Sequence, residues 1–269
     1  MQVLPAGRAP GEPVREVRRP GEPFDRFVLA GWEDAFPGLV AGVTAAEEGA
    51  DFGFTTAPSA WEHVGRARGL ARQLGFSRIA MVRQEHGRAV RHVPGGSWEG
   101  LLVADDADGL VVDREGVLAC VTAADCVPVY LLDPVRGRAA LLHAGWRGAT
   151  AGILEAGVQA LNERDGDPTT WRMHLGPAIC GSCYEVGSEV LRAFGLPGEE
   201  GSRVDLRHVL ARRAVAAGVP EGRVSRSEWC TRCSLDQFHS HRGKGARAGR
   251  MAAYLGWKEV GSIRRRPGG

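Results

Sequence analysis

Residues 141–148 read Leu-Leu-His-Ala-Gly-Trp-Arg-Gly, an apolar run that delivers a histidine to a glycine-flanked turn. The run predicts a buried strand, and the turn predicts the start of a helix. His143 therefore stands at the end of a strand, beside a helix end whose free N–H groups favour anions. Arg147 falls one or two residues into that helix, where a guanidinium would complete a phosphate or carboxylate pocket. A pairing of Arg147 with a surface carboxylate is the alternative.

Short apolar segments rich in branched residues recur on both sides of this stretch. The strands that we predict cover residues 27–30, 39–43, 78–83, 89–93, 109–112, 117–122, 127–132, 139–143 and 172–175. Helical periodicity covers residues 60–74, 148–164, 188–194 and 206–217, with Ser59 and Asp205 as N-caps. Several strands follow one another without an intervening helix. This order predicts a mixed α+β architecture rather than a repeating βαβ wheel.

The chain has 269 residues, of which 43% are apolar, and this is enough for a full core. Residues 1–23 contain five prolines and two Gly-Glu-Pro triplets with almost nothing apolar to bury, so we predict a flexible tail there. From Phe24 onward apolar segments arrive at short intervals. We therefore predict one domain over residues 24–269.

The overall charge gives no sign of a nucleic-acid partner, because the formal net charge is only +2. No apolar stretch approaches the roughly 20 residues that span a bilayer, and the N-terminus lacks the apolar segment of a signal peptide. We expect no membrane partner and a cytoplasmic location. The oligomeric state has no signal in the sequence.

Two histidines and a cysteine stand at the ends of apolar strands, where a sheet can present side chains to a common edge. They are His86, Cys126 and His143, and they lie 40 and then 17 positions apart. Imidazole and thiolate suit Zn²⁺, and a catalytic zinc takes three protein ligands and leaves a fourth position open. Such a zinc would lower the pKa of a bound water toward about 7. Burial of each histidine for structural reasons is the alternative.

The remaining cysteines include two Cys-X-X-Cys pairs, at residues 180–183 and 230–233. Together they could close a structural Cys₄ zinc site. Cys230 lies 47 positions after Cys183, much farther than in the usual zinc ribbon, so we expect ordinary packing or redox-inert thiols. Cys120 lies inside a predicted strand and is expected in the core.

A basic, glycine-rich segment, residues 238–245, precedes the last apolar segment. It could be a mobile lid that brings Arg242 or Lys244 to an anionic substrate, or a solvated loop, which the sequence alone favours. Trp146 could stack on a planar ligand, although a tryptophan beside a tight turn is more often packed in the core.

Five motifs occur in a fixed order along the chain. They are residues 84–87 (QEHG), 124–129 (ADCVPV), 143–148 (HAGWRG), 176–186 (GPAI and CYEV) and 249–253 (GRMAA). From about residue 24 to 260 the chain thereby closely resembles the multicopper polyphenol oxidase, or laccase-domain, family. That family includes the bacterial peptidoglycan editing factor and enzymes of purine nucleoside metabolism.

The resemblance implies a single domain with a mixed β-sandwich-like core flanked by helices, and a zinc ion held by His86, Cys126 and His143. It also implies phosphorolysis of adenosine, inosine or methylthioadenosine to the base and sugar 1-phosphate, together with adenosine deamination and a possible task in peptidoglycan editing. The expected ligands are a purine nucleoside and phosphate. The catalytic residues are the three metal ligands and Arg147, and the substrate-binding residues are Gln84, Asp125, Trp146, Arg242 and Arg250.

One position departs from the family pattern. Relatives commonly carry a second arginine and an acidic residue after the Ser-X-Arg of the C-terminal loop, whereas residues 240–244 here read Ser-His-Arg-Gly-Lys. The part played by that pair in substrate binding is open in this chain.

Three other functions use the same residues. A copper-dependent polyphenol oxidase would use the His₂Cys ligand set, but its second cluster needs several His-X-His pairs, and the chain has eight histidines with one such pair. A metal-free cysteine hydrolase would use Cys126 as nucleophile and a histidine as base on an amide or cell-wall precursor. A non-catalytic protein would only bind a nucleotide or cell-wall intermediate.

Overall fold

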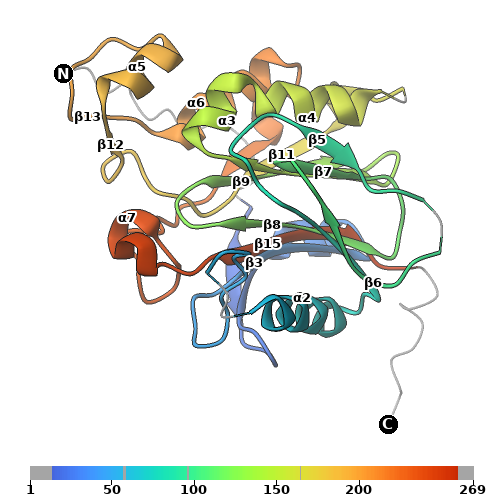
Figure 1. Ribbon diagram of the computed structural model, residues 1–269. Helices are drawn as coiled ribbons and strands as arrows, with labels where there is room; N and C mark the ends of the chain where they lie inside the picture. The colour runs from blue at the N-terminus through green and yellow to red at the C-terminus, as the bar shows by residue number, and fades with distance from the viewer. Residues whose placement is uncertain (1–13, 57–58, 96, 164, 260–269) are drawn as a thin grey trace.

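Two β-sheets pack face to face at the centre of the molecule, and helices cover their outer faces (Figure 1). The structure is a computed structural model that describes residues 14–56, 59–95, 97–163 and 165–259. This arrangement confirms the predicted mixed α+β domain with a sandwich-like core.

Among the described residues, the first sheet has seven strands and the second has six. The first runs in the order β1 (Glu16–Arg19), β2 (Arg26–Leu29), β3 (Leu39–Thr44), β15 (Met251–Trp257), β8 (Val117–Ala123), β4 (Arg78–Val82) and β6 (Gly100–Ala104). The second runs in the order β14 (Val224–Arg226), β11 (Arg172–Leu175), β9 (Val127–Asp133), β10 (Arg138–Ala144), β7 (Gly109–Val112) and β5 (Val90–His92). A separate antiparallel pair joins β12 (Glu185–Val186) to β13 (Ser202–Arg203).

Both sheets are mixed. Parallel pairs join β8 to β4, β4 to β6, β11 to β14 and β5 to β7, and the other pairs within the two sheets are antiparallel. The central strands β8, β9 and β10 are buried along their whole length, as expected for strands covered on both faces.

The helices form the outer layers of the sandwich. They are α1 (Ala30–Ala35), α2 (Ala60–Leu74), α3 (Trp146–Ala151), α4 (Ile153–Asn162), α5 (Ser188–Phe194), α6 (Leu206–Ala216) and α7 (His241–Lys244), with 3₁₀ turns at Pro168–Thr170, Glu221–Arg223 and Gly245–Arg247. One apolar cluster fills the space between the sheets, a second lies between the second sheet and α3 to α6, and a third lies under α2. Ser59 and Asp205 cap α2 and α6 with their side chains, as predicted.

The predicted helix over residues 148–164 is two helices. Gly152 adopts φ +94° between α3 and α4, and this left-handed conformation ends the first helix and begins the second. Apolar periodicity continues across the break, so the sequence pattern hides it. Strands β1, β6, β12, β13 and β14 were not predicted, and β15 lies in the last apolar segment, which follows the basic segment 238–245.

Part of the segment predicted as a flexible tail forms a strand of the first sheet. Residues 1–13 lie outside the described residues, but β1 lies inside the range expected to be flexible and pairs with β2 along its whole length. The buried carboxylate of Glu16 explains the order, because it contacts His174 Nε2 at 3.0 Å and accepts a hydrogen bond from the Ser227 hydroxyl. Glu16 thereby ties the first sheet to β11 of the second sheet and to Ser227, which directly follows β14.

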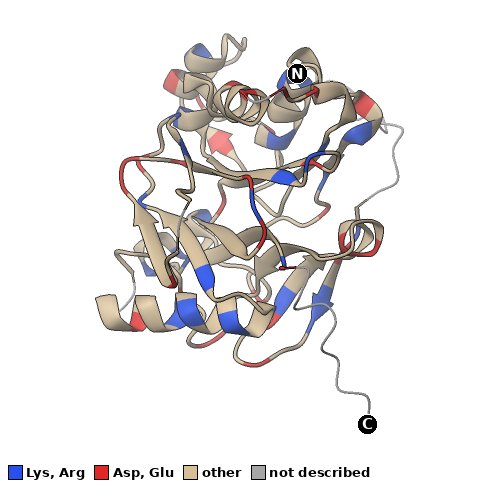
Figure 2. Cartoon of the chain, turned by 90° about the vertical axis from the view of Figure 1, so that its right-hand side faces the viewer, with Lys and Arg blue, Asp and Glu red and all other residues tan. Residues whose placement is uncertain are grey.

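Charged residues of both signs alternate on the outer helices and loops, whereas the inner strands are almost free of them (Figure 2). This distribution agrees with the near cancellation of 34 basic and 32 acidic residues in the sequence. Within the described residues, no helix has the length and apolar character needed to cross a membrane.

Candidate metal centre

His86, Cys126 and His143 meet at one edge of the sandwich, as the sequence predicts. Cys126 directly precedes β9 and His143 lies near the end of β10, and these strands are antiparallel with His143 opposite Pro128. His86 follows β4, in the connection that leaves the first sheet for the second. Their ligand atoms all lie within 4.8 Å of one another, and the two imidazole rings are 4.8 Å apart, edge to face.

The carboxylate of Asp108 orients two of these ligands. It accepts backbone N–H groups from Glu85 at 3.2 Å, His86 at 3.0 Å and Gly87 at 2.7 Å, and it contacts His143 Nδ1 at 2.8 Å. Because Nδ1 of His143 is engaged, Nε2 is the nitrogen left for a metal. A carboxylate that orients a histidine ligand is typical of zinc sites.

Opposite charges in this cluster stabilise one another. Burial raises the pKa of the Cys126 thiol, but His143 and His86 outweigh it and lower the pKa to about 6. Burial lowers the pKa of His143, but the Cys126 thiolate and Asp108 raise it to about 9. Burial likewise raises the pKa of Asp108, yet its bonds to His143 and to backbone N–H groups lower it overall. The cluster therefore favours a thiolate, the form of cysteine that binds metals.

This donor set fits zinc. Two imidazoles and one thiolate are ligands that Zn²⁺ prefers, and three protein ligands are the number found in catalytic sites. The chemistry of the residues thus supports the predicted ligand set.

Two glycines of the turn before and within α3 allow it to approach these ligands. A Cβ on Gly145 would lie 2.9 Å from Cys126 Sγ and 3.2 Å from His86 Cδ2, and a Cβ on Gly148 would lie 2.7 Å from the carbonyl oxygen of Gly87. Glycine at both positions therefore lets α3 pack on the turn that carries His86. This contact brings Arg147 to the edge of the metal centre.

Arg147 is the second residue of α3 and is exposed, and its guanidinium lies 4.4 Å above the ring of Trp146. The half-buried Trp146 packs against the apolar cluster under the helices. The guanidinium of Arg147 therefore covers one face of the Trp146 ring. Among the described residues, Arg147 has no carboxylate partner within salt-bridge distance.

Tyr184 lies close to Cys126 and to the cationic side chains of Arg147 and Arg242. Burial and the nearby Cys126 raise the pKa of Tyr184 to about 12, while the cationic Arg242 and Arg147 oppose the shift. The Arg242 guanidinium lies 5.4 Å from the centre of the Tyr184 ring. Tyr184 stands in a motif of the sequence, but nothing in that motif distinguishes it as a site residue.

Asp125 has φ +90° and joins three segments beside Cys126. Its carboxylate accepts hydrogen bonds from the Thr231 hydroxyl and from the backbone N–H of Arg242, both at 2.6 Å. The Arg242 side chain also donates to the carbonyl of Glu185 at 2.9 Å. Within the segment 238–245, predicted as a lid or a solvated loop, residues His241–Lys244 form the short helix α7, which is exposed to solvent and held beside Cys126 by these contacts.

Gln84 and Arg250, expected to bind substrate, have partners within the protein. Gln84 exchanges hydrogen bonds with Thr122, through both the backbone and the hydroxyl group, each at 2.8 Å. Arg250 donates its guanidinium to the carbonyls of Ala248 and Gly249, at 2.7 and 3.1 Å. Gln84 thereby joins the end of β4 to β8. The substrate-binding roles of these two residues stay predictions.

The four cysteines of the two Cys-X-X-Cys pairs lie together, although 47 positions separate Cys183 from Cys230 in the sequence. Their sulfur atoms lie within 4.8 Å of one another. The backbone pairs Ala178 with Cys230 and so closes the long gap in sequence. Cys120 is fully buried in the core, as predicted.

Asp108 and Thr231 were missed as site residues by the sequence analysis. Asp108 stands in the segment Ala104–Gly109, which contains three aspartates, and its neighbours Asp105 and Asp106 are exposed. The only signal is position: Asp108 is the aspartate that directly precedes a strand buried along its whole length. Thr231 lies between two cysteines and carries no signal of its own.

Comparisons with known proteins agree on one family. Residues 45–258 match the family described as multi-copper polyphenol oxidoreductase laccase. The purine nucleoside phosphorylase YlmD of Geobacillus stearothermophilus is 33% identical over 252 residues, which cover 83% of this chain and 92% of the relative. The adenosine deaminase RL5, from an unknown prokaryotic organism, is 34% identical over 67% of this chain and 76% of its own length.

Solved structures of relatives share the fold. The crystal structure of YlmD from Geobacillus stearothermophilus superposes with a TM-score of 0.79 at 29% identity and covers 92% of this chain and 100% of its own. The hypothetical protein YfiH of Bacillus licheniformis has a TM-score of 0.78 at 27% identity, over 90% of this chain and 99% of its own.

Proposed function

Because the chain belongs to the multi-copper polyphenol oxidoreductase laccase family, we propose that it is a zinc-dependent purine nucleoside phosphorylase that also deaminates adenosine. The observation that supports this most is the placement of a three-ligand metal site beside two cationic side chains. The ligands are His86, Cys126 and His143, and the cations are Arg147 and Arg242. A nucleoside and an anion can thereby be bound at one centre.

Phosphorolysis needs a bound phosphate held against the sugar. A phosphate oxygen forms a bond to C1′, the bond from C1′ to the base nitrogen breaks, and the base leaves with the electron pair and takes up a proton. Arg147 and Arg242 would bind the phosphate, because both guanidinium groups are exposed and charge-assisted hydrogen bonds to phosphate are strong. Asp125 would position Arg242 through the bond to its backbone N–H.

A zinc ion held by His86, Cys126 and His143 would supply Lewis acidity to the reacting group. Asp108 would fix the tautomer and orientation of His143, and its three backbone contacts would hold the turn that carries His86. Adenosine deamination, in which water replaces the amino group, would use the same ligands without phosphate. A role in peptidoglycan editing, together with a cytoplasmic location, stays a prediction from the resemblance and the sequence.

A second candidate function rests on the same contacts. Cys126, His143 and Asp108 have the order of a nucleophile, a base and a residue that orients the base. This supports a metal-free cysteine hydrolase. A multicopper oxidase has less support, because neither metal-ligand group among the described residues has more than two histidines.

The products formed from adenosine separate these functions. We expect protein purified without added metal to contain zinc, to release adenine and ribose 1-phosphate only with phosphate, and to form inosine without it. Removal of zinc by a chelator should abolish both reactions. Metal-free protein that cleaves an amide by a Cys126 acyl intermediate, and leaves adenosine unchanged, would favour the hydrolase.

A further inference from the structure

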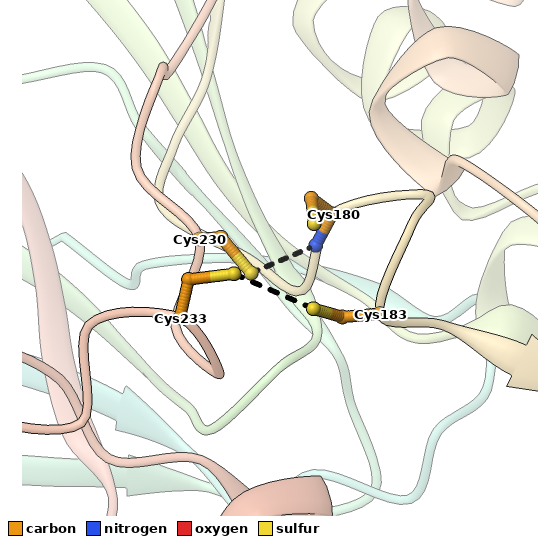
Figure 3. A group of neighbouring side chains, drawn as sticks. All are labelled: Cys180, Cys183, Cys230 and Cys233. Atoms are coloured by element: carbon orange, nitrogen blue, oxygen red, sulfur yellow. Dashed lines mark hydrogen bonds between the residues drawn. The ribbon is translucent and has the colours of Figure 1, made fainter.

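A second group of metal-ligating side chains lies outside the centre described above. Cys180 and Cys183 stand on the loop between β11 and β12, and Cys230 and Cys233 stand on the segment that follows β14. Figure 3 shows the two loops side by side, with Cys230 and Cys233 directed toward Cys180 and Cys183. We propose that these four cysteines bind one structural zinc ion.

The distances between the sulfur atoms suit a tetrahedral site. With Zn–S bonds of about 2.3 Å, the sulfurs of a Cys₄ zinc site lie about 3.8 Å apart. Here all four lie within 4.8 Å of one another, and those of Cys183 and Cys233 are 3.4 Å apart. Small rotations of the side chains would bring the four to equal separations.

The backbone holds both loops in place for a metal. The N–H of Cys183 donates to the carbonyl of Cys180 at 3.0 Å, and the N–H of Ser234 donates to the carbonyl of Cys230 at 3.0 Å, so each pair spans a tight turn. The N–H of Cys180 donates to the sulfur of Cys230 at 3.3 Å. Such a bond stabilises negative charge on a thiolate ligand.

The two turns are also joined to each other. Ala178 forms a bridge with Cys230, and its carbonyl accepts the N–H of Thr231 at 3.2 Å. The four thiols are therefore brought together by contacts that do not depend on the metal. Preformed loops lower the entropy lost when a metal binds.

This site would support the wall of the first metal centre. Thr231, which lies between Cys230 and Cys233, donates its hydroxyl to Asp125, and the N–H of Ile179 donates to the carbonyl of the same aspartate at 3.1 Å. Tyr184 directly follows Cys183. A zinc ion at the four cysteines would thus fix two of the three segments that contact Asp125, the residue before Cys126.

The site is testable apart from the proposed function, because it uses none of the ligands of the first centre. We expect purified wild-type protein to contain about two zinc ions per chain. Cys126→Ser should contain about one, and the Cys183→Ser/Cys233→Ser protein should retain only the zinc at the first centre. Cys120→Ala is the matched control, since this thiol lies in the core, and it should keep both ions.

Cobalt gives a readout that does not require the four-cysteine variants to fold. Co²⁺ loaded into Cys126→Ser should show the absorption of a tetrahedral tetrathiolate complex. This result does not depend on nucleoside cleavage, because the variant lacks a ligand of the first centre and keeps all four cysteines. One metal ion per chain in the wild type, all of it lost in Cys126→Ser, would overturn the proposal. A Cys183–Cys233 disulfide found by mass spectrometry of unreduced protein would overturn it too.

Discussion

Asp108 is the residue on which the geometry of the first metal centre most depends. Its carboxylate is fully buried and contacts the histidine of one strand and the turn that carries the other histidine. Asp108→Asn should keep part of this geometry but lose the charge that orients His143. We expect zinc affinity to fall by about 10- to 100-fold, as for other partners of zinc-bound histidines, measured by competition with a chelating dye.

The matched control is Asp105→Asn, because Asp105 lies three positions earlier and is exposed in a pair with Arg83. It should bind zinc like the wild type. Equal affinities of the two variants would mean that Asp108 supports only the fold.

Substitution of Arg147 should affect the two proposed reactions, phosphorolysis and deamination, to different extents. Arg147→Ala should depress phosphorolysis, measured as kcat/KM with varied phosphate, by roughly 1.5–3 kcal/mol, the range for a hydrogen bond to a charged group. Deamination uses water and should lose much less. Arg172→Ala is a suitable control, since Arg172 also covers an aromatic ring, at 5.5 Å from Phe36.

If Arg147→Ala lowered both rates equally at unchanged zinc content, the side chain would instead orient the nucleoside or support the fold. An unchanged phosphorolysis rate would remove it from the site.

The meeting of His86, Cys126 and His143 could be predicted from the sequence, but the residues that surround them could not. His86, Cys126 and His143 each follow or precede an apolar run, and such positions meet at the edge of a sheet. Asp108 and Tyr184 act through neighbours that are distant in sequence. No local pattern distinguishes them from other polar residues.

At the scale of secondary structure, the tight packing of α3 on the turn after β4 sets the position of Arg147. Gly148→Ala would place a Cβ 2.7 Å from the carbonyl oxygen of Gly87, and a backbone atom cannot move aside easily. We expect this variant to lose about 1–3 kcal/mol of unfolding free energy, measured with denaturant, and to bind zinc more weakly.

Gly65→Ala in α2 is the comparison, because a Cβ there meets nothing within 4 Å. It should stabilise the protein by about 0.5–1 kcal/mol, since alanine favours helix more than glycine does. Destabilisation by both substitutions to the same extent would contradict the packing argument.

Most helices and strands with a clear apolar pattern could be predicted, whereas the two-residue strands could not. The bounds of α2 and α5 agree with the predicted ranges, and those of β7 and β11 do as well. The break between α3 and α4 at Gly152 was not predicted, because apolar residues keep helical spacing on both sides of it. The two-residue strands β12 and β13 are too short to show any period.

The whole molecule depends on contacts between its two sheets, and Glu16 supplies one that joins β1 to β11 and to the residue after β14. Glu16→Ala would leave His174 without its Nε2 partner, and His174 is fully buried. We expect a loss of roughly 1–3 kcal/mol in unfolding free energy, the range for an unsatisfied buried polar group. Glu48→Ala, at an exposed loop position, should have little effect.

Unchanged stability of Glu16→Ala would support the prediction from composition that the whole segment before Phe24 is a flexible tail. Composition suggested that prediction, because residues 1–23 are rich in proline and poor in apolar side chains. A buried carboxylate paired with a distant histidine has no signature in composition. The same reason explains why the sequence underrated the four cysteines, whose loops are joined by the pairing of Ala178 with Cys230.

The measurement that most directly tests zinc-dependent nucleoside cleavage at His86, Cys126 and His143 is a zinc titration of metal-stripped protein, followed as adenine release from adenosine in phosphate. We expect stripped wild-type protein to be inactive and to regain activity as zinc is added. Cys126→Ser should regain almost none, because a hydroxyl is a much poorer zinc ligand than a thiolate. Full activity in stripped wild-type protein, or equal recovery by Cys126→Ser, would contradict the account.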